Sequence, residues 1–439
     1  MRVEFSPWLT QAAERDPDGV AVVDRAGDTT WAQLEEAAGA AADELAARGV
    51  GAGAHVAVVL EPGIDFVVAL HACLCVGAVA VPVDTRLTAG ERGAHCAGVA
   101  SVVDAPLPTR GPPRVARPFG LDEIATAVHT SGTSAAPRKV EQTYGNWLWS
   151  ALGSAVALGL RRDDRWLCAL PLAHVGGLSV VLRGAIYGTT VVLHERFDED
   201  RVLAELNNPA GPTMVSLVPT TLTRLLDAGL RAPPSLRCAL VGGAPVPAAL
   251  VDRARAAGVP VSATYGLTEA CSQVATVPPG WADQSAAPPL FGTRLRIDDD
   301  GEILVAGPTV APGAVGPDGW LHTGDLGRLD ERGRLTPVGR SAHTIITGGE
   351  NVAPEEVEAA LAEHPAVAEA AVAGIPDSEW GEVVVANVVL RPGVLAEPAE
   401  LQDFCRRRLA AFKVPKRIVV VDEIPQTISG KVLRKRFVY

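Results

Sequence analysis

A run of small and hydroxyl-bearing residues precedes two cations in the sequence HTSGTSAAPRKVEQTYGN, residues 129–146. Small residues let several backbone N–H groups turn toward one point, which is how a loop binds phosphate oxygens, and Ser and Thr hydroxyls add donors. A guanidinium pairs with phosphate in a fork geometry. The run matches neither GxGxxG nor GxxxxGK[ST], so an ordinary Ser/Thr-rich turn is the alternative. The candidate phosphate-binding residues are Thr130, Ser131, Gly132, Thr133 and Arg138.

The elements that must position this run are short apolar strands alternating with helices. The segments that read as buried strands include HVAVVL (55–60), IATAVHT before the run, TTVVLHE, TMVSLVP, LRCALVGG and PVSATYG. Strands of this kind, with helices such as PTTLTRLLDAGL between them, predict a parallel, doubly wound α/β sheet. Beyond residue 290, DG and RG turns predict an antiparallel, β-rich subdomain. We expect a large N-terminal core over 1–342 and a small, mobile α+β domain over 343–439.

Composition limits the classes of function. The 439 residues are 48% hydrophobic and 21% charged, which is enough apolar material for two or more cores. The net charge of −12 argues against nucleic acid as a partner, because such binders usually present a basic surface. The seven cysteines include no CxxC pair, so we expect free thiols in a reducing compartment. A polar N-terminus and the lack of a long apolar stretch predict a cytoplasmic protein without membrane insertion.

The opening run resembles the phosphate-binding signature TSGTTGxPKG of the adenylate-forming superfamily, which contains acyl-CoA synthetases, luciferases and peptide-synthetase adenylation domains. Further signatures of that superfamily follow in order along the chain. They are PLAHVGGL (171–178, substrate-loop histidine), YGLTEA (265–270, similar to YGxTE), GWLHTGD (319–325, ribose aspartate), GR (339–340, hinge), GGENV (348–352) and PQTISGKVLR (425–434, similar to PxTxxGK). The chain is identified as a member because the resemblance spans nearly its whole length.

This resemblance implies an adenylation reaction, in which a carboxylate joins the α-phosphorus of ATP and pyrophosphate is expelled. Two anions must meet, so charge neutralisation is the central problem. In the family, the adenine lies against the ring of Tyr265, beside the GGAP turn that contains Gly243. Asp325 and Arg340 hold the ribose, although Asp325 taken alone also reads as a turn residue.

The resemblance also implies which groups meet the reacting atoms. Glu269 and Thr133 are the expected ligands of Mg²⁺, a hard cation that prefers oxygen, and Thr268 contacts the α-phosphate. Lys431, from the small domain, bridges the carboxylate and the α-phosphate. His174 belongs to the substrate loop, with a buried core histidine as the alternative interpretation.

The second half-reaction requires a thiol to attack the adenylate, and the resemblance implies that CoA supplies it. In the family, the small domain swings about a hinge, which is His343 here, where relatives carry Asp or Lys. The segment GGENV then lines the pantetheine tunnel, and Gly348 and Gly349 suit a narrow channel because they have no Cβ. The implied partners are a small-molecule acid, ATP and CoA, with Mg²⁺ as metal and a homodimer as an option.

Segments between the motifs are similar to the o-succinylbenzoate–CoA ligases of menaquinone biosynthesis, over residues 142–160, 171–193 and 261–277. The acid they activate carries a second carboxylate that does not react. Arg183, a lone cation in an apolar segment, is the candidate anchor for it, with a surface arginine as the alternative. The other substrate-binding candidates are Ser272, Gln273 and Thr276 as polar contacts and Gly176 and Gly177 as clearance for the aromatic ring.

The phosphate loop departs from the family pattern, because Ala135, Arg138 and Lys139 stand where the family has Gly, Lys and Gly. A Cβ at the glycine positions stiffens the loop and opposes a positive φ. Three alternatives stay open: a CoA ligase for another aryl or acyl acid, a stand-alone adenylation enzyme that loads a carrier protein, and, because of the altered loop, a degenerate nucleotide-binding module. The presence of Lys431 argues against the last, because a binding module does not need it.

Overall fold

The structure is a computed structural model. It describes residues 4–111, 116–130, 138–340, 345–347, 350–377, 380–409, 411–426, 432–433 and 437, with the main chain alone at 340, 346, 350, 351 and 381. Packing contacts divide the chain into two compact units, one of residues 1–295 and 305–322 and one of residues 296–304 and 323–439. These units are defined by packing and do not test the boundary between functional domains that we expect after residue 342, which stays a prediction.

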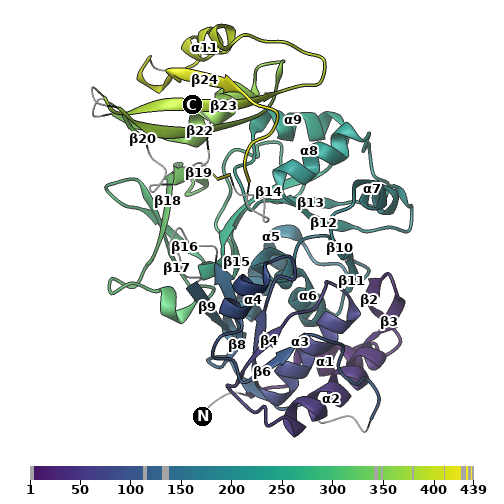
Figure 1. Cartoon of the computed structure of the whole chain (residues 1–439). Coiled ribbons are helices and arrows are strands. Elements are labelled where there is room, and N and C mark those ends of the chain that lie inside the picture. Colours follow the sequence, from purple (N-terminus) through teal and green to yellow (C-terminus); the bar gives the residue numbers. More distant parts are fainter. Residues whose placement is uncertain are drawn as a thin grey trace. The chain divides into compact units, whose positions relative to one another are not determined.

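The first unit contains an eight-stranded sheet in the order β15-β14-β13-β12-β10-β11-β2-β3 (Figure 1). The six strands β2, β11, β10, β12, β13 and β14 pair in parallel. The two edge strands, β3 and β15, are antiparallel to their neighbours. The bounds are β2 (Val20–Asp24), β3 (Gly27–Thr30), β10 (Arg165–Cys168), β11 (Thr190–Leu193), β12 (Met214–Leu217), β13 (Cys238–Val241), β14 (Val261–Leu267) and β15 (Ser272–Thr276). This arrangement confirms the predicted doubly wound α/β fold.

A second, five-stranded sheet of the first unit has the order β6-β4-β5-β8-β9. Its β4, β5, β6 and β8 run parallel, and β9 returns antiparallel to β8. The bounds are β4 (His55–Val58), β5 (Val79–Pro82), β6 (Ser101–Val103), β8 (Ile124–Thr130) and β9 (Arg138–Thr143). A separate two-stranded sheet pairs β1 (Glu4–Phe5) with β7 (Phe119–Gly120). The predicted strand IATAVHT is β8.

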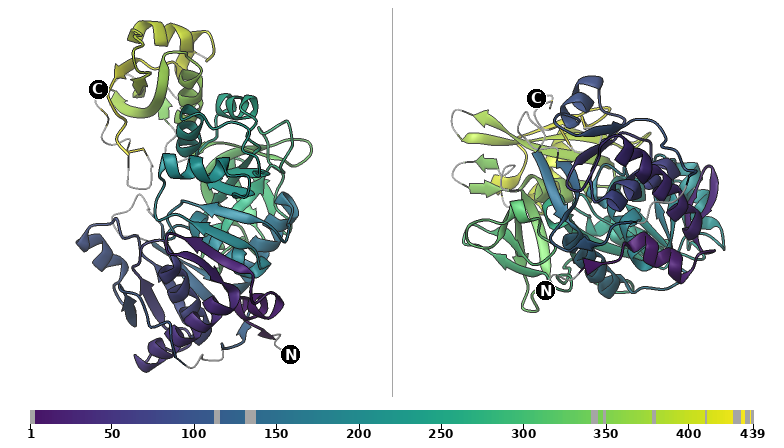
Figure 2. Two further views of the ribbon diagram at one scale, coloured as in Figure 1. Left: turned by 90° about the vertical axis from the view of Figure 1, so that its right-hand side faces the viewer. Right: turned by 90° about the horizontal axis from the view of Figure 1, so that it is seen from below.

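Helices flank the two sheets (Figure 2). Thr30 and Thr143 begin α2 and α5 with capping boxes, which satisfy the free N–H groups of the first turn. Every residue of α3 from Phe66 to Val76 is buried, which explains why its sequence is apolar on all sides. The bounds are α1 (Trp8–Arg15), α2 (Trp31–Ala47), α3 (Ile64–Val76), α4 (Ala89–His95), α5 (Tyr144–Leu158), α6 (Val175–Tyr187), α7 (Glu199–Asn207), α8 (Pro219–Asp227), α9 (Ala248–Ala256), η1 (Thr268–Ala270) and η2 (Pro312–Ala314).

Both faces of the eight-stranded sheet are covered. Neighbouring residues of β10 point to opposite faces, so Trp166 packs in a core with Phe66 and Trp147, while Leu167 packs in a second core with Leu222. Burial of each large apolar side chain contributes about 1.5–3 kcal/mol. A parallel sheet covered on both faces requires the near-continuous apolar strands that the sequence shows.

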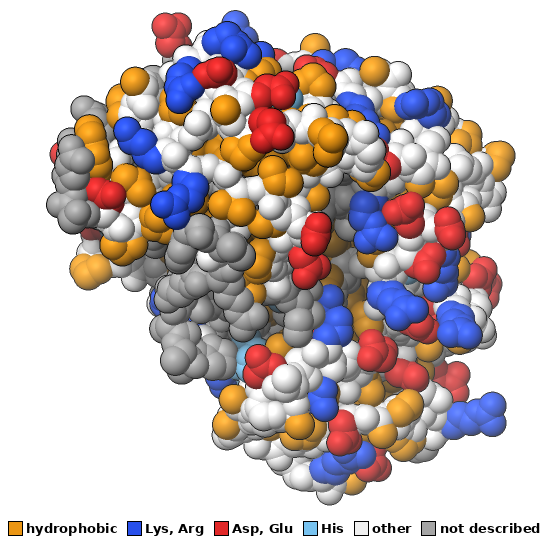
Figure 3. All heavy atoms as spheres, turned by 45° about the horizontal axis from the view of Figure 1, so that its top comes forward, with side chains coloured by type: hydrophobic (Ala, Val, Ile, Leu, Met, Phe, Trp, Pro, Cys, Tyr) orange, Lys and Arg blue, Asp and Glu red, His pale blue; other side chains and the backbone are white. Residues whose placement is uncertain are grey.

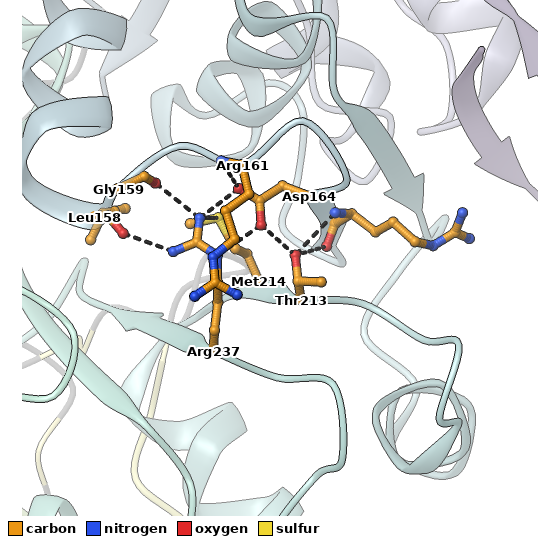
Figure 4. A network of polar contacts seen from close by, with 8 residues as sticks. Leu158, Gly159, Arg161, Asp164, Thr213, Met214 and Arg237 are labelled. Atoms are coloured by element: carbon orange, nitrogen blue, oxygen red, sulfur yellow. Dashed lines mark hydrogen bonds and ion pairs between the residues drawn. The ribbon is translucent and has the colours of Figure 1, made fainter.

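A buried ion pair ties three central strands to the end of α5 (Figure 4). The guanidinium of Arg237 donates from Nε and Nη2 to the two carboxylate oxygens of Asp164 at 2.7 and 2.6 Å, and from Nη1 to the Leu158 carbonyl at 2.7 Å. The Thr213 hydroxyl also donates to Asp164, at 2.8 Å. Burial alone raises the pKa of Asp164, but the hydrogen bonds from Arg237 and Thr213 outweigh it and lower that pKa.

The second unit is built on two sheets. One has the order β16-β17-β18-β19, and the other has the order β21-β20-β23-β22 with β24 beside β23. Val357, Val372 and Leu401 form the core of the second sheet with its two helices. The bounds are β16 (Arg294–Ile297), β17 (Glu302–Ala306), β18 (Leu321–Leu329), β19 (Leu335–Arg340), β20 (Ile345–Thr347), β21 (Glu350–Val352), α10 (Pro354–Ala362), β22 (Val367–Asp377), β23 (Gly381–Leu390), α11 (Pro398–Arg406), η4 (Ala411–Lys413) and β24 (Arg417–Val420).

Acidic and basic side chains are interspersed over the face drawn in Figure 3. All seven cysteines are free thiols, as predicted, and six of them are buried while Cys96 is partly exposed. Among the helices that the structure describes, none is both long and apolar enough to cross a bilayer.

Candidate active site

The phosphate-loop candidates begin at the end of the β8–β9 hairpin where residues 131–137 connect the two strands. Thr130 and Arg138 are paired across the two strands, and the Thr130 hydroxyl donates to the Arg138 carbonyl at 3.4 Å. Ser131, Gly132, Thr133 and Ala135 lie outside the described residues. The last strand pair before the loop thus brings the Thr130 hydroxyl and the exposed Arg138 side chain to one end of the hairpin.

Lys139 lies one step further along this hairpin, paired with His129. It belongs to the extended strand β9, and the positive-φ residues of the described chain do not include it. The expectation that a Cβ at this position strains the loop was therefore wrong for Lys139, because extended backbone accepts any side chain. His129 adds no charge here: burial, followed by the charges of His95 and Lys139, lowers its pKa to about 4.

The YGLTEA motif forms a tight reversal from β14 through η1 into β15. A Cβ on Gly266 would lie 1.8 Å from the Ser272 carbonyl oxygen, so only glycine fits where the two strands meet. Cys271 and Ser272 adopt positive φ values of 55° and 89°. Such conformations cost non-glycine residues about 1–3 kcal/mol each, and they persist only where the surroundings enforce them.

Three contacts from other elements hold this reversal. The Gln142 amide donates to the Thr268 carbonyl at 3.0 Å, and the Ala311 N–H donates to the Glu269 carbonyl at 2.8 Å. The Ser150 hydroxyl donates to the Cys271 carbonyl at 2.7 Å. The carbonyls of the reversal therefore face inward, while the side chains of Thr268 and Glu269 stay partly exposed, as a phosphate contact and a metal ligand require.

Tyr265 lies in the last part of β14, and Gly243 follows the adjacent parallel strand β13. Val241 of β13 pairs with Ala263 of β14, so Gly243 and Tyr265 each stand two residues beyond a paired position at the same carboxyl edge. Ligands of open α/β sheets bind outside this edge. Gly243 has a φ of 78°, which turns the chain away after β13 and leaves the residue exposed. The arrangement brings the adenine candidates together.

His174 stands at the start of α6 with its side chain 40% exposed, so the core-histidine interpretation was wrong. Its Nε2 lies 3.9 Å from Oδ2 of Asp84. Burial raises the pKa of Asp84, but hydrogen bonds from Arg86 and the charges of Arg86 and His174 bring it below its usual range. Asp84 is therefore an anion beside the candidate substrate loop.

Arg183 is buried in α6 with only 1% exposed, so the surface-arginine interpretation was wrong. Its Nη2 donates to the Ser150 hydroxyl at 3.0 Å, and its guanidinium carbon lies 5.8 Å from the centre of the Trp166 ring. Burial lowers the pKa of Arg183. Within the described part of the chain no carboxylate reaches ion-pair distance of Arg183, and its Nε has no hydrogen-bond partner. A buried cation without a carboxylate has capacity for an anion.

The polar candidates after the YGLTEA motif turn inward. Gln273 and Thr276 are 2% and 0% exposed, and the Gln273 amide donates to the Thr276 hydroxyl at 2.8 Å. The Thr276 hydroxyl also shares a 2.8 Å hydrogen bond with Thr264. Protein groups thus already contact the Thr276 hydroxyl, and its role as a polar contact for the acid stays a prediction. Ser272 is half-buried, 3.4 Å from the Ser179 hydroxyl.

The two glycines at the start of α6 differ in their surroundings. A Cβ on Gly177 would lie 2.5 Å from the Pro171 carbonyl oxygen and 2.9 Å from that of Leu170. The small size of Gly177 thus lets α6 pack against the loop that precedes it. This is a structural reason for glycine, separate from the expected space for the aromatic ring of the acid. A Cβ on Gly176 would meet only Leu170, at an ordinary 3.6 Å.

Asp325 of the second unit pairs with Arg340 across β18 and β19. Asp325 is 7% exposed, and its own N–H donates to the Thr323 hydroxyl at 3.1 Å. The register brings the two ribose candidates to opposite positions of one hairpin, with only the main chain of Arg340 described. The hinge, tunnel and catalytic candidates His343, Gly348, Gly349 and Lys431 lie outside the described residues.

Sequence reasoning missed Gln142, Ser150 and Asp84. Gln142 carried a weak signal, since it is a polar residue at a position of β9 that alternation turns inward. Ser150 lies on α5 between Trp149 and Ala151, and Asp84 follows a buried strand, a common place for polar residues. No pattern in the sequence points to their partners.

Comparisons with known proteins point in one direction. The model of the AMP-binding enzyme family matches residues 9–103 and 94–314, and that of the AMP-binding enzyme C-terminal domain matches residues 356–431. A 2-succinylbenzoate–CoA ligase of Bacillus subtilis (strain 168) is 39% identical, over 99% of this chain and 98% of that protein. One of Bacillus cereus (strain ATCC 14579) is 38% identical, over 98% and 97%.

Solved structures agree. The o-succinylbenzoate CoA synthetase of Bacillus subtilis in complex with its acyl-adenylate intermediate has a TM-score of 0.91 at 38% identity, over 99% of this chain and 98% of that one. The complex with ATP and magnesium ion has a TM-score of 0.89 at 37% identity, over 99% of both chains. ATP-bound MatB of Rhodopseudomonas palustris has a TM-score of 0.88 at 27% identity, over 99% of both.

Proposed function

The chain belongs to the AMP-binding enzyme family, and from that premise we propose that it is an AMP-forming ligase that joins 2-succinylbenzoate to CoA. The observation that carries the proposal is similarity to 2-succinylbenzoate–CoA ligases over the full length of both chains. The inward-turned YGLTEA reversal and the paired ends of the β8–β9 hairpin support it, because they present hydroxyl, carboxylate and cationic groups of the kinds that adenylation needs. The product serves menaquinone biosynthesis.

In the first half-reaction, a carboxylate oxygen of the acid attacks the α-phosphorus of ATP. The bond from that phosphorus to the bridging oxygen of pyrophosphate breaks, and pyrophosphate leaves. Residues 130–133 and Arg138 hold the phosphates, Thr268 donates to the α-phosphate, and Lys431 neutralises the two anions as they meet. The adenosine lies against Tyr265 and Gly243.

Glu269 and Thr133 are the residues that would hold Mg²⁺. The partly exposed Glu269 carboxylate, on a turn whose carbonyls are held inward, has the oxygen donor and the fixed position that this ion favours. Bound Mg²⁺ supplies positive charge to the phosphate oxygens. Asp325 and Arg340, opposite each other in their hairpin, hold the ribose.

In the second half-reaction, the sulfur of CoA attacks the acyl carbon and loses its proton, and the bond from that carbon to the phosphate oxygen of AMP breaks. A swing of the C-terminal domain about His343 brings Gly348 and Gly349 to line the thiol channel. The adenylate is therefore made in one arrangement of the domains and consumed in another. CoA, ATP and the acid are the partners we propose.

The acid itself is proposed to be held by α6 and the loop before it. Arg183 receives the carboxylate that does not react, because it is a buried cation with no acidic partner in the described chain. His174 lies beside the reacting end of the acid, and Gly176 leaves space for the ring. We place the enzyme in the cytoplasm, where the free thiols stay reduced. A homodimer remains part of the proposal.

A panel of acids tests this function. Pyrophosphate release is measured with 2-succinylbenzoate, benzoate, malonate and a fatty acid, each with and without CoA. We expect pyrophosphate release when 2-succinylbenzoate is the acid. Once CoA is added, AMP and the thioester should form. Preference for another acid would contradict the proposed substrate. A carrier-loading enzyme would form the adenylate but leave CoA unused, and a degenerate module would release no pyrophosphate with any acid.

A further inference from the structure

We propose that Gln142 is a positioning residue for the adenylation half-reaction, which rests on the function proposed above. Its side chain connects the β8–β9 hairpin, whose end carries the phosphate-loop residues Thr130 and Arg138, to the reversal that carries Thr268 and Glu269. Gln142 thus couples two groups of ligand-binding residues that lie far apart in the sequence.

A chain of buried hydrogen bonds fixes the orientation of the Gln142 amide. The indole N–H of Trp147 donates to the Thr126 hydroxyl at 2.9 Å, and that hydroxyl donates to Oε1 of Gln142 at 2.8 Å. Nε2 of Gln142 then donates to the Thr268 carbonyl at 3.0 Å. Because the Thr268 carbonyl can only accept, the Gln142 NH₂ group must face it, and Oε1 must then accept from the Thr126 hydroxyl, which itself accepts from the Trp147 indole. The amide oxygen is thereby committed to Thr126 and the NH₂ group to Thr268.

Burial makes this chain rigid. Thr126 and Gln142 are both 0% exposed and face each other as a strand pair, and Trp147 is 1% exposed. Water cannot replace a lost partner at such a site without a rearrangement, so each hydrogen bond specifies one geometry. Trp147, Thr126 and Gln142 are too buried to contact a ligand directly. Any effect of Gln142 on the reaction must therefore pass through Thr268.

The Thr268 carbonyl is the point of transmission. It accepts from Gln142 and also from the Cys271 N–H at 3.1 Å, so both its lone pairs are used. These two bonds hold η1 just before the positive-φ residues Cys271 and Ser272. Without the amide, the turn is free to relax, and the Thr268 hydroxyl and Glu269 carboxylate move relative to the hairpin. Misplacement of about 1 Å at a reacting centre can cost about 10²-fold in rate.

Gln142→Leu tests the proposal because it keeps the volume and removes both polar groups. We expect the kcat of pyrophosphate release to fall about ten- to hundredfold and the Mg²⁺ concentration for half-maximal rate to rise. The KM for the acid and the thioester step from preformed adenylate should change far less. Gln402→Leu, which removes an amide that donates to the Pro415 and Lys416 carbonyls of the second unit, is the matched control and should keep wild-type kinetics.

A second pair of variants decides the matter if Gln142→Leu does not fold. Thr126→Val removes the orienting hydroxyl and should lower the kcat of pyrophosphate release, as Gln142→Leu does. Thr126→Ser keeps the hydroxyl and should retain the wild-type kcat. Folded variants of Gln142 and Thr126 with wild-type kcat and Mg²⁺ dependence would overturn the proposal.

Equilibrium binding of Mg·ATP separates this proposal from the proposed function. If the wild type activates no acid, the function fails, yet weaker Mg·ATP binding by the Gln142→Leu variant would still support the positioning role. Unchanged Mg·ATP binding in that case would contradict it.

Discussion

The buried guanidinium of Arg183 donates to the Ser150 hydroxyl at 3.0 Å, and Ser150 in turn donates to the Cys271 carbonyl at 2.7 Å. The candidate anchor of the acid is thus joined, through one hydroxyl, to the strained turn that follows Glu269. The proposed acid anchor and the turn proposed to hold Mg²⁺ therefore share one hydrogen-bonded support, the Ser150 hydroxyl.

The first prediction concerns Arg183. Arg183→Met keeps most of the volume and removes the charge, so the KM for 2-succinylbenzoate should rise by the equivalent of about 1.5–3 kcal/mol, the range for a hydrogen bond to a charged group. The KM for ATP should change little. Ser150→Ala retains the cation and should affect acid binding less. An unchanged KM for the acid, combined with a lower Tm, would show that Arg183 only supports the fold.

The second prediction separates the two glycines of α6. Gly177→Ala should lower the Tm even without ligand, because its Cβ would lie 2.5 Å from the Pro171 carbonyl oxygen. Gly176→Ala should leave the Tm unchanged and raise the KM for the acid, if this position provides clearance for the ring. Thermal unfolding and steady-state kinetics measure the two effects. Equal Tm values for the two variants would contradict the structural distinction.

The third prediction concerns the phosphate loop. Restoring the family residues by Ala135→Gly and Arg138→Lys should speed adenylation and tighten ATP, if a Cβ and a planar guanidinium handicap phosphate binding. Lys139→Gly should give no such gain, because Lys139 lies in an extended strand, and should instead destabilise the hairpin by about 0.5–1 kcal/mol. A clear loss of activity on restoring residues 135 and 138 would mean that Arg138 has adapted to grip the phosphates.

The fourth prediction concerns Lys431. Lys431→Ala should abolish adenylation and spare thioester formation from preformed adenylate, if the lysine acts only when the C-terminal domain faces the ATP site. Lys435→Ala, four residues further along the chain, is the control that removes a cation outside the PxTxxGK motif. Equal loss of both half-reactions in the Lys431 variant would remove the argument for alternating domains.

The fifth prediction concerns the Asp164–Arg237 pair, whose side chains are 3% and 13% exposed. Arg237→Met leaves a buried carboxylate without its partner and should cost about 3–5 kcal/mol of unfolding free energy. Asp252→Asn, which breaks the exposed pair with Arg255, should cost under about 1 kcal/mol. Denaturant unfolding measures the free energy of unfolding of both variants. Similar losses would contradict the claim that burial makes the Asp164–Arg237 pair the more important of the two.

The same pair sets a pH dependence. The folded-state pKa of Asp164 is lowered, so its stabilising contribution is fully present above the unfolded value of about 3.9. That contribution is lost as the pH falls through the lower folded value. The difference in stability between wild type and Arg237→Met should therefore shrink on acidification below about pH 4.

The sequence by itself determined the order of the elements and the reaction class. The strand IATAVHT, the helix PTTLTRLLDAGL and the α+β texture after residue 343 all fold as their patterns predict, because periodicity and turn chemistry depend on neighbouring residues. The signatures of the family are likewise local, so phosphate, ribose and metal candidates could be named from short runs of residues.

Only the tertiary structure decided how these candidates are supported. Whether Arg183 is buried, whether Thr276 is free and whether Lys139 is strained depend on groups brought in from other elements. Gln142 and Thr268 are separated by 126 positions, and no local pattern encodes a hydrogen bond over that distance. The choice of partner for a buried polar group is made by packing, since each such group must find its hydrogen bond wherever the folded chain provides one.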